Sequence, residues 1–220
     1  MMEQLDVPIF ERAAPGYRSA RNALLEAELQ LRDQVEAVAA QRRRLPAGPS
    51  IEDYVFTDVA TGERVKLSEL FGKSDALLVY NMMYAPNDAA PCRMCTMWVD
   101  GFNAVQGQLN EVAPMAVIAR APVGKLRALR DARGWQRVRL LSSQPEYSRM
   151  VGSEDGDGDQ IPVICVFRRS GNDISLWYRA SAEFPDESNR GIDLLTPVWN
   201  LLDLLPGGRP DWHPAPVTAP

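Results

Sequence analysis

Apolar residues recur along the chain with two different periods, which divide it into a long N-terminal helix and a series of strands and helices after it. Residues 17–44 carry an apolar stripe at helical spacing, and Pro46 follows. The stripe consists of Leu24, Ala27, Leu31, Val35 and Val38. A stripe of this kind that stops at a proline predicts a single amphipathic helix. Residues 46–50, rich in proline and glycine, predict a linker after it.

The segment from residue 54 to residue 81 predicts a hairpin followed by a buried strand. Short alternating runs at 54–58 and 64–67 flank a turn that contains Gly62, which is typical of a hairpin. Residues 68–72 predict one turn of helix closed by glycine. Residues 76–81 are nearly all apolar, as a strand covered on both faces must be, so we expect the central strand of the sheet here.

The rest of the chain alternates between predicted strands and predicted helices. A predicted helix begins at two cysteines and reaches residue 109, and a strand at 115–119 and a helix at 123–133 follow it. The pattern then predicts a short edge strand at 138–141 and a turn of helix at 145–151. Two strands at 161–167 and 174–178, joined by residues 168–173, and a final helix at 192–205 complete the order. This order predicts an α/β fold with a mixed sheet. We expect a helical arm and linker at 1–49, one domain at 50–206 and an irregular tail at 207–220.

Length and composition are those of one domain with an appended arm. The chain has 220 residues, 45% of them hydrophobic, which is enough for a core of its own. Its 24 basic and 29 acidic residues give a net charge of −5 without a basic block, so we expect no nucleic-acid partner. The first residues are acidic where a signal peptide would be basic, and no apolar run approaches the roughly 18 residues of a membrane span. We therefore expect a cytoplasmic protein without a membrane partner.

The candidate chemistry is concentrated in Cys92-Arg93-Met94-Cys95, which holds two of the three cysteines at the start of a predicted helix. In a reducing cytosol, a close pair of cysteines is typical of redox or metal chemistry. The helix N-terminus and the Arg93 cation favour a thiolate at Cys92, which would attack a disulfide. Cys95, one turn further and on the apolar face, would keep its proton longer and release the mixed disulfide.

Two further features support this site. Ile161-Pro162 stands at the start of an apolar strand, where proline fits a strand edge or a turn because it donates no ladder hydrogen bond. Its peptide bond could be trans or cis. Trp98 lies with Phe102 on the apolar face of the helix that begins at the cysteines, which favours a core or groove residue.

Together, the strand at 76–81, the Cys-x-x-Cys at a helix start and Ile161-Pro162 before a hairpin resemble the thioredoxin superfamily. Within it, the sequence resembles a bacterial family known as domain of unknown function 899. The motifs that carry this resemblance are the helix ending in Arg-Arg-Arg-Leu-Pro, Asp53-Tyr54-Val55-Phe56, Leu67-Ser68-Glu69-Leu70-Phe71, Trp98-Val99-Asp100-Gly101-Phe102, Arg120-Ala121-Pro122 and Leu202-Asp203-Leu204-Leu205-Pro206-Gly207-Gly208-Arg209. In this order they span nearly the whole chain.

The resemblance implies a thioredoxin-like three-layer fold and dithiol–disulfide exchange at Cys92 and Cys95. It also implies a cis bond at Ile161-Pro162, opposite the cysteines. The partners would be thiols and disulfides of proteins or small molecules, with no cofactor and no metal. A homo-oligomer could form through the N-terminal helix.

The sequence also departs from thioredoxin. Arg93-Met94 stands between the cysteines where thioredoxin has Gly-Pro, so its redox potential does not carry over. Thioredoxin keeps a buried aspartate on the strand beneath the disulfide, and the nearest equivalents here are Tyr80 and Asn81. Water or Asp88 in the following loop is left as the proton acceptor for the resolving thiol.

Other interpretations of the cysteines remain open. A zinc half-site would need two more ligands, and only Cys165 and the single histidine, His213, are at hand. Cys165 lies in an apolar strand, which favours a buried, inert thiol. A peroxiredoxin-like peroxidase would carry proline seven residues and Thr or Ser three residues before its reactive cysteine, but Ala85 and Ala89 stand there. A binding or scaffold protein with unreactive cysteines is the third alternative.

The acidic segment at residues 153–159 could suggest a calcium loop. An EF-hand would need glycine where Gln160 stands and glutamate where Val166 stands, so an acidic surface loop is favoured.

Overall fold

The chain forms two units, Met1–Pro46 and Ala47–Pro220, in the computed structural model. The structure describes residues 8–182, 195–207 and 211–217. Each unit is described by itself.

The first unit is almost entirely helical. Helix α1 spans Pro8–Glu11, and α2 spans the 29 residues Pro15–Arg43, with a proline at its start, where the missing N–H costs nothing. This confirms the long helix expected from the apolar stripe. No residue of α2 is buried, and Leu24, Leu31 and Val35 of the stripe are exposed.

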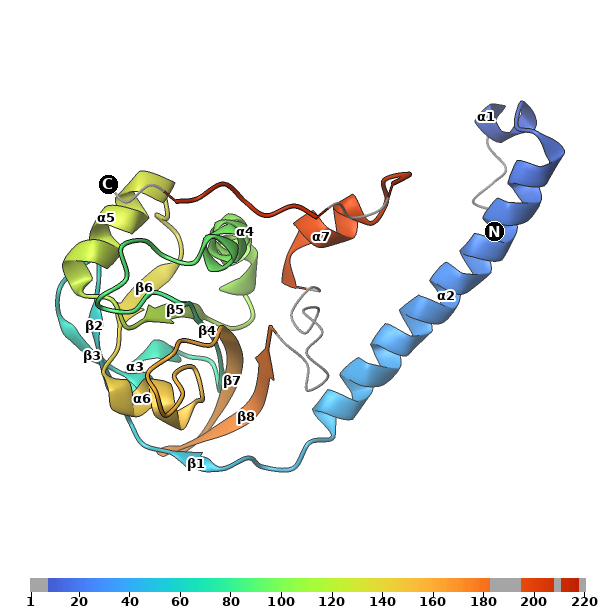
Figure 1. The fold of residues 1–220 in the computed structure, drawn as a ribbon. Helices are drawn as coiled ribbons and strands as arrows, with labels where there is room; N and C mark the ends of the chain where they lie inside the picture. Colours follow the sequence, from blue (N-terminus) through green and yellow to red (C-terminus); the bar gives the residue numbers. More distant parts are fainter. Residues whose placement is uncertain (1–7, 183–194, 208–210, 218–220) are drawn as a thin grey trace. The chain divides into compact units, whose positions relative to one another are not determined.

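The second unit is built on one mixed sheet of eight strands among the described residues, in the order β1-β8-β7-β4-β5-β6-β2-β3 (Figure 1). The strands are β1 Ser50–Ile51, β2 Val55–Asp58, β3 Arg64–Lys66, β4 Ala76–Asn81, β5 Met115–Ala119, β6 Arg139–Ser142, β7 Val163–Ser170 and β8 Asp173–Ser181. Strands β4, β5 and β6 run parallel, and every other pairing is antiparallel. The central position of β4, between β5 and β7, explains its apolar run.

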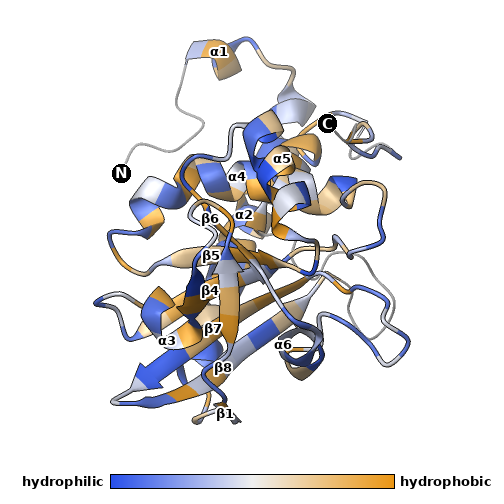
Figure 2. Cartoon of the chain, turned by 90° about the vertical axis from the view of Figure 1, so that its left-hand side faces the viewer, coloured by the Kyte–Doolittle hydropathy of each residue, from blue (hydrophilic) through white to orange (hydrophobic). Residues whose placement is uncertain are grey.

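Helices cover both faces of this sheet, as Figures 1 and 2 show. Helices α4 (Arg93–Leu109) and α5 (Val123–Arg133) pack on one face, and α3 (Leu67–Leu70) and α6 (Pro145–Met150) pack on the other. Each face has its own hydrophobic cluster, with Tyr80 and Trp98 on the α4 side and Phe56 and Tyr147 on the α6 side. These three layers confirm the thioredoxin-like α/β fold.

The structure corrects two expectations about the strands. Strand β6 is not an edge strand, because β2 of the first hairpin pairs with it on the side away from β5. The turn between β7 and β8 is also much shorter than residues 168–173, because Ser170 still pairs with Asp173. Gly171, with φ of 60°, allows the chain to reverse within two residues.

The ends of the second unit also differ from expectation. The final helix, α7, spans only Pro197–Leu202, because Thr196 caps it and Pro197 fixes its first turn. Residues 192–194 of the expected helix lie outside the described residues. The expected linker packs on β8: the Leu176 N–H donates to the Pro49 carbonyl at 3.0 Å, and a Cβ on Gly48 would lie 1.8 Å from the Leu176 oxygen.

No helix among the described residues is long and apolar enough to cross a membrane.

Candidate active site

The cysteine pair lies where the loop after β4 turns into α4. The backbone N–H of Cys92 donates to the Met83 carbonyl at 3.1 Å, which joins the two ends of that loop. Cys92 is the N-cap of α4, and its Sγ accepts a hydrogen bond from the Cys95 backbone N–H at 3.5 Å. The Thr96 N–H and hydroxyl both donate to the Cys92 carbonyl, at 3.0 and 2.9 Å. Cys92 thus takes the place that Ser or Asp usually fills at a helix start.

This position stabilises the anionic form of Cys92. Its thiol is partly exposed, and its pKa is lowered to about 6. The largest cause is a hydrogen bond from the Cys95 side chain, and the backbone N–H groups of Cys95 and Met94 add to it against the opposing effect of burial. The exposed Arg93 guanidinium contributes least. Cys92 is therefore mainly a thiolate at neutral pH.

Cys95 has the opposite environment. Its side chain is fully buried, and its Sγ accepts a hydrogen bond from the Met83 backbone N–H at 3.4 Å. Burial raises the pKa of Cys95 well above the usual value, and the hydrogen bond to Cys92 and the charge of Cys92 raise it further. Cys95 therefore keeps its own proton at a pH where Cys92 has lost its proton.

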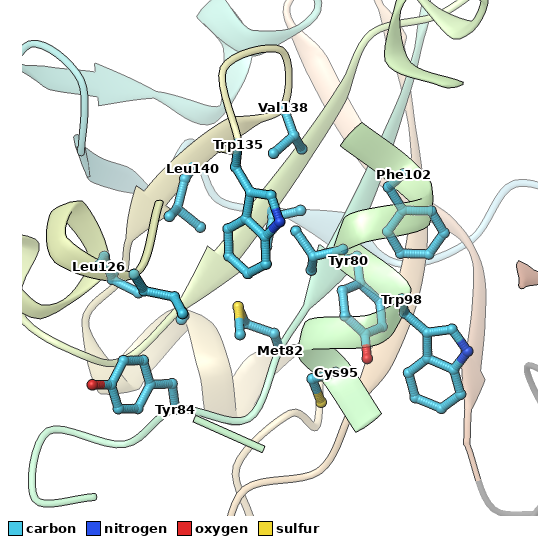
Figure 3. Close-up of a cluster of buried hydrophobic side chains, with 14 of the residues drawn as sticks. Tyr80, Met82, Tyr84, Cys95, Trp98, Phe102, Leu126, Trp135, Val138 and Leu140 are labelled. Carbon is cyan, nitrogen blue, oxygen red and sulfur yellow. The ribbon is translucent and has the colours of Figure 1, made fainter. Parts of the chain in front are cut away.

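Tyr80 of β4 lies under the pair, with its ring against Trp98 and Phe102 at centroid distances of 6.0 and 5.2 Å (Figure 3). Among the described residues its buried hydroxyl has no hydrogen-bond partner of ordinary geometry, yet it lies close enough to Cys95 to lower the pKa of that thiol. Burial raises the pKa of Tyr80 itself well above the usual value. The hydroxyl therefore stays protonated beside the Cys95 thiol.

The other two polar residues considered near the pair have different contacts. Asn81 lies on the opposite face of the sheet, where its Nδ2 donates to the Val163 carbonyl at 3.3 Å and to Cys165 Sγ at 3.6 Å. The Asp88 carboxylate accepts from the Ala85 backbone N–H at 2.7 Å and so caps its own loop. Of the two residues at the thioredoxin aspartate position, Tyr80 is the one on the side of the cysteines.

A cavity of about 480 Å³ opens onto the pair. Cys92, Cys95 and Trp98 line it from α4, and Ile161 and Pro162 line it from the start of β7. The structure therefore brings together five of the six predicted site residues around one cavity. Arg93, the sixth, does not line this cavity and acts on Cys92 through its charge.

The Ile161–Pro162 bond is trans, since the described residues contain no cis peptide bond. The cis bond implied by the thioredoxin resemblance is therefore wrong for this structure. Backbone hydrogen bonds hold the segment on both sides: the Ile161 N–H donates to the Ser153 carbonyl at 2.9 Å, and the Ala182 N–H donates to the Pro162 carbonyl at 3.3 Å.

The acidic segment before Ile161 is partly buried. Residues 155–159 are exposed, as expected of a surface loop, but Glu154 is buried against Arg120 at 2.8 Å and Arg149 at 3.3 Å. Gln160 also donates to the Glu154 carboxylate, at 3.2 Å. The charge of the buried Glu154 carboxylate is thus neutralised by two guanidinium groups.

The C-terminal part of the chain adds residues that the sequence analysis did not assign to the site. Trp199 of α7, Trp212 and His213 line the same cavity as the cysteines. The tail was expected to be irregular, and its described residues 211–217 form no helix or strand. The sequence signal that could have predicted this packing is the adjacent pair of aromatic residues Trp212 and His213 in a proline-rich tail.

The third cysteine, Cys165, is buried in β7, and burial raises its pKa to about 12. It lies on the face of the sheet opposite Cys95. In the part of the chain that the structure describes, no three side chains of the kinds that bind metals come together.

The model of the family described as "Bacterial protein of unknown function (DUF899)" matches residues 6–216. The chain belongs to this family. The match covers both units, so the long helix and the cysteine-bearing domain are parts of one family pattern.

Several solved structures are similar to this member of the DUF899 family. Peroxidoxin BcpB from Mycobacterium tuberculosis is 23% identical over 64% of this chain and 88% of that chain, with a TM-score of 0.49. A mutant of peroxiredoxin Q from Xanthomonas campestris is 16% identical over 70% and 96%, with a TM-score of 0.48. An exposed lipoprotein thioredoxin from Streptococcus pneumoniae is 11% identical over 57% and 87%, with a TM-score of 0.42. Among curated proteins, none matches the sequence.

Proposed function

We propose that the protein is a dithiol–disulfide oxidoreductase that uses Cys92 as the attacking thiol and Cys95 as the resolving thiol. The observation that carries this proposal is the opposite state of two thiols one helical turn apart. Cys92 has a pKa of about 6 and faces a cavity, whereas Cys95 is buried and protonated behind it.

The exchange takes two steps. The Cys92 thiolate attacks one sulfur of a substrate disulfide, forms a mixed disulfide and releases the other sulfur as a thiolate. Cys95 then attacks Cys92 Sγ, which breaks the mixed disulfide and forms the Cys92–Cys95 bond. The two released thiolates take up the proton of Cys95 and one proton from solvent. The protein is oxidised by two electrons, and the substrate is reduced by two.

The surroundings support these roles. A low pKa at Cys92 supplies the nucleophile, and the Met83 N–H at Cys95 Sγ can stabilise the second thiolate as it forms. We infer a cytoplasmic location, because a reducing compartment keeps the pair in the dithiol form that starts this cycle.

Trapping the intermediate tests this proposal. A Cys95→Ser protein should form a stable mixed disulfide on Cys92 when it is treated with a disulfide, and non-reducing mass spectrometry detects it. The matched control, Cys165→Ser, should form only the Cys92–Cys95 bond. If the reduced protein stays a dithiol under excess oxidised glutathione and under peroxide, the proposal is wrong.

The same thiolate could attack a peroxide, which is the alternative peroxidase function. A partly exposed cysteine with a pKa of about 6 is the observation that favours it. Stopped-flow measurement of peroxide consumption separates the two functions. A rate constant no higher than that of free cysteine excludes the peroxidase.

Helix α2 could serve a further role as an assembly surface, as in the scaffold alternative. Its apolar side chains Leu24, Leu31 and Val35 are exposed within its own unit. We infer a homo-oligomer formed through this helix. Size-exclusion chromatography of a protein that lacks residues 1–45 tests it, and an unchanged oligomeric state would count against it.

A further inference from the structure

The cavity at the cysteines is lined by aromatic side chains from α4 and from the C-terminal part of the second unit. Trp98 comes from α4, Trp199 from α7 and Trp212 from the segment after it. Trp199 and Trp212 contact each other edge to face, with ring centroids 6.0 Å apart. Ile161 and Pro162 complete the wall opposite. A substrate that reaches Cys92 through this cavity therefore contacts apolar and aromatic surfaces.

Trp98, one of the residues that line the cavity, has a buried polar atom without a partner among the described residues. Trp98 is 4% exposed, and its Nε1–H is buried and has no hydrogen-bond acceptor among the described residues. Figure 3 shows this nitrogen on the edge of the ring that is turned away from Tyr80. A buried donor without an acceptor is costly, so a ligand that brings an acceptor gains more from it than a purely apolar one.

The size and depth of the cavity favour a small molecule over a folded protein. Its volume of about 480 Å³ lies within the usual range for small-ligand sites, roughly 300–1,000 Å³. Cys92 is only partly exposed, and Trp199 and Trp212 line the same cavity as its thiol.

We propose that the substrate of this site is a small organic disulfide that carries an aromatic or apolar group and a hydrogen-bond acceptor near its sulfur atoms. This inference rests on the proposed exchange function and names its substrate class. The apolar group packs against the Trp199 and Trp212 side chains that line the cavity, the acceptor meets the Trp98 N–H, and the disulfide faces Cys92. In a single turnover the dithiol supplies both electrons, and an added dithiol such as dithiothreitol restores it for further cycles.

Two matched disulfides test the apolar requirement. N,N′-dibenzoylcystamine and N,N′-diacetylcystamine share the same amide and the same type of leaving thiol, and differ only in phenyl against methyl. Each rate constant with the reduced protein is divided by that with dithiothreitol, which removes differences in intrinsic reactivity. We expect the benzoyl compound to react about tenfold faster or more on this scale, because a buried phenyl ring gains apolar contact.

The outcomes separate this inference from the proposed function. Equal normalised rates, or faster reduction of insulin than of either compound, would overturn the small-substrate inference and leave disulfide exchange standing. If none of the three disulfides is reduced and Cys92 and Cys95 stay unpaired, the proposed function and this inference both fail.

A variant pair locates the apolar contact. Trp212→Ala should reduce the benzoyl-to-acetyl rate ratio several-fold, because it removes one wall of the cavity. Leu204→Ala, a change just after α7 at a side chain that is 77% exposed and outside the cavity, should leave the ratio as it is. Equal ratios in the two variants would overturn the assignment of this wall. Alkylation of Cys92 by iodoacetamide checks that each variant keeps its thiolate.

A second pair of disulfides tests the role of the hydrogen-bond acceptor in the substrate. Bis(4-phenylbutyl) disulfide has the length and phenyl group of the benzoyl compound but carries no oxygen. The wild type should prefer the benzoyl compound on the normalised scale, and Trp98→Phe, which keeps an aromatic ring and removes the N–H, should abolish that preference. No preference in the wild type, or an unchanged preference in Trp98→Phe, would overturn the role of the Trp98 N–H.

Discussion

The two faces of the central sheet each bury a tyrosine near a cysteine, yet only one of them forms a candidate active site. On the α4 face, Tyr80 lies by Cys95, and on the α6 face Tyr147 lies near Cys165. In the part of the chain that the structure describes, both hydroxyls lack a hydrogen-bond partner of ordinary geometry, and burial raises the pKa of both thiols. What differs is Cys92, a second thiol at the helix start with a pKa of about 6. Burial alone makes a thiol inert, and a neighbouring thiolate at a helix N-terminus makes the pair reactive.

The largest expected difference between the faces is in activity. Cys92→Ser should lower the rate of disulfide reduction by at least about a thousandfold, because it removes the nucleophile. Cys165→Ser should change that rate little, since Cys165 is buried on the other face. The measurement is the initial rate of disulfide reduction with dithiothreitol as the final reductant. A large loss in Cys165→Ser with an intact fold would break the comparison.

The pKa of Cys92 should depend on its partner across the helical turn. Cys95→Ala removes the hydrogen bond that lowers this pKa most, so the pKa of Cys92 should rise by about one to two units. Thiolate absorbance at 240 nm, followed against pH, gives the value. Cys165→Ala serves as the control and should leave the titration of Cys92 unchanged. A Cys92 titration that is the same in both variants would mean that the helix N-terminus alone sets the pKa.

The two tyrosines provide the finest test. Tyr80→Phe removes a hydroxyl that lowers the pKa of Cys95, so the resolving step should slow a few-fold and the mixed disulfide should accumulate. Tyr147→Phe, the matched change on the other face, should leave that step unaffected. Both variants should keep their unfolding free energy within about 1 kcal/mol, because each loses an unpaired buried hydroxyl. Rapid acid quench and mass spectrometry follow the intermediate. Equal kinetics in the two variants would deny Tyr80 a role.

Much of the fold could be predicted because local patterns determined it. The run at 76–81 could only be a strand buried on both faces, and the apolar face from Cys95 to Leu109 could only be a helix that packs on it. Strand β6 was misjudged as an edge because its pairing with β2 joins residues more than 80 positions apart, such as Thr57 and Ser142. No local pattern carries such a contact.

The site could be predicted in part for the same reason. Cys92 and Cys95 are close in sequence, so helix geometry alone relates them. Tyr80 and Asn81 could not be told apart from composition, because only the alternation of β4 puts Tyr80 on the side of the cysteines. The contribution of Trp212 and His213 depends on how the C-terminal segment packs on the domain, which tail composition does not determine.

The central claim is that the start of α4 makes Cys92 a thiolate at neutral pH. The rate of alkylation of Cys92 by iodoacetamide, measured against pH on the reduced Cys165→Ser protein, tests it most directly, with the modified peptide quantified by mass spectrometry. Because the pKa is lowered, the rate should rise as the pH increases through about 6 and stay constant above about pH 7. A midpoint at or above about 8.5, the value of an ordinary cysteine, would contradict the account.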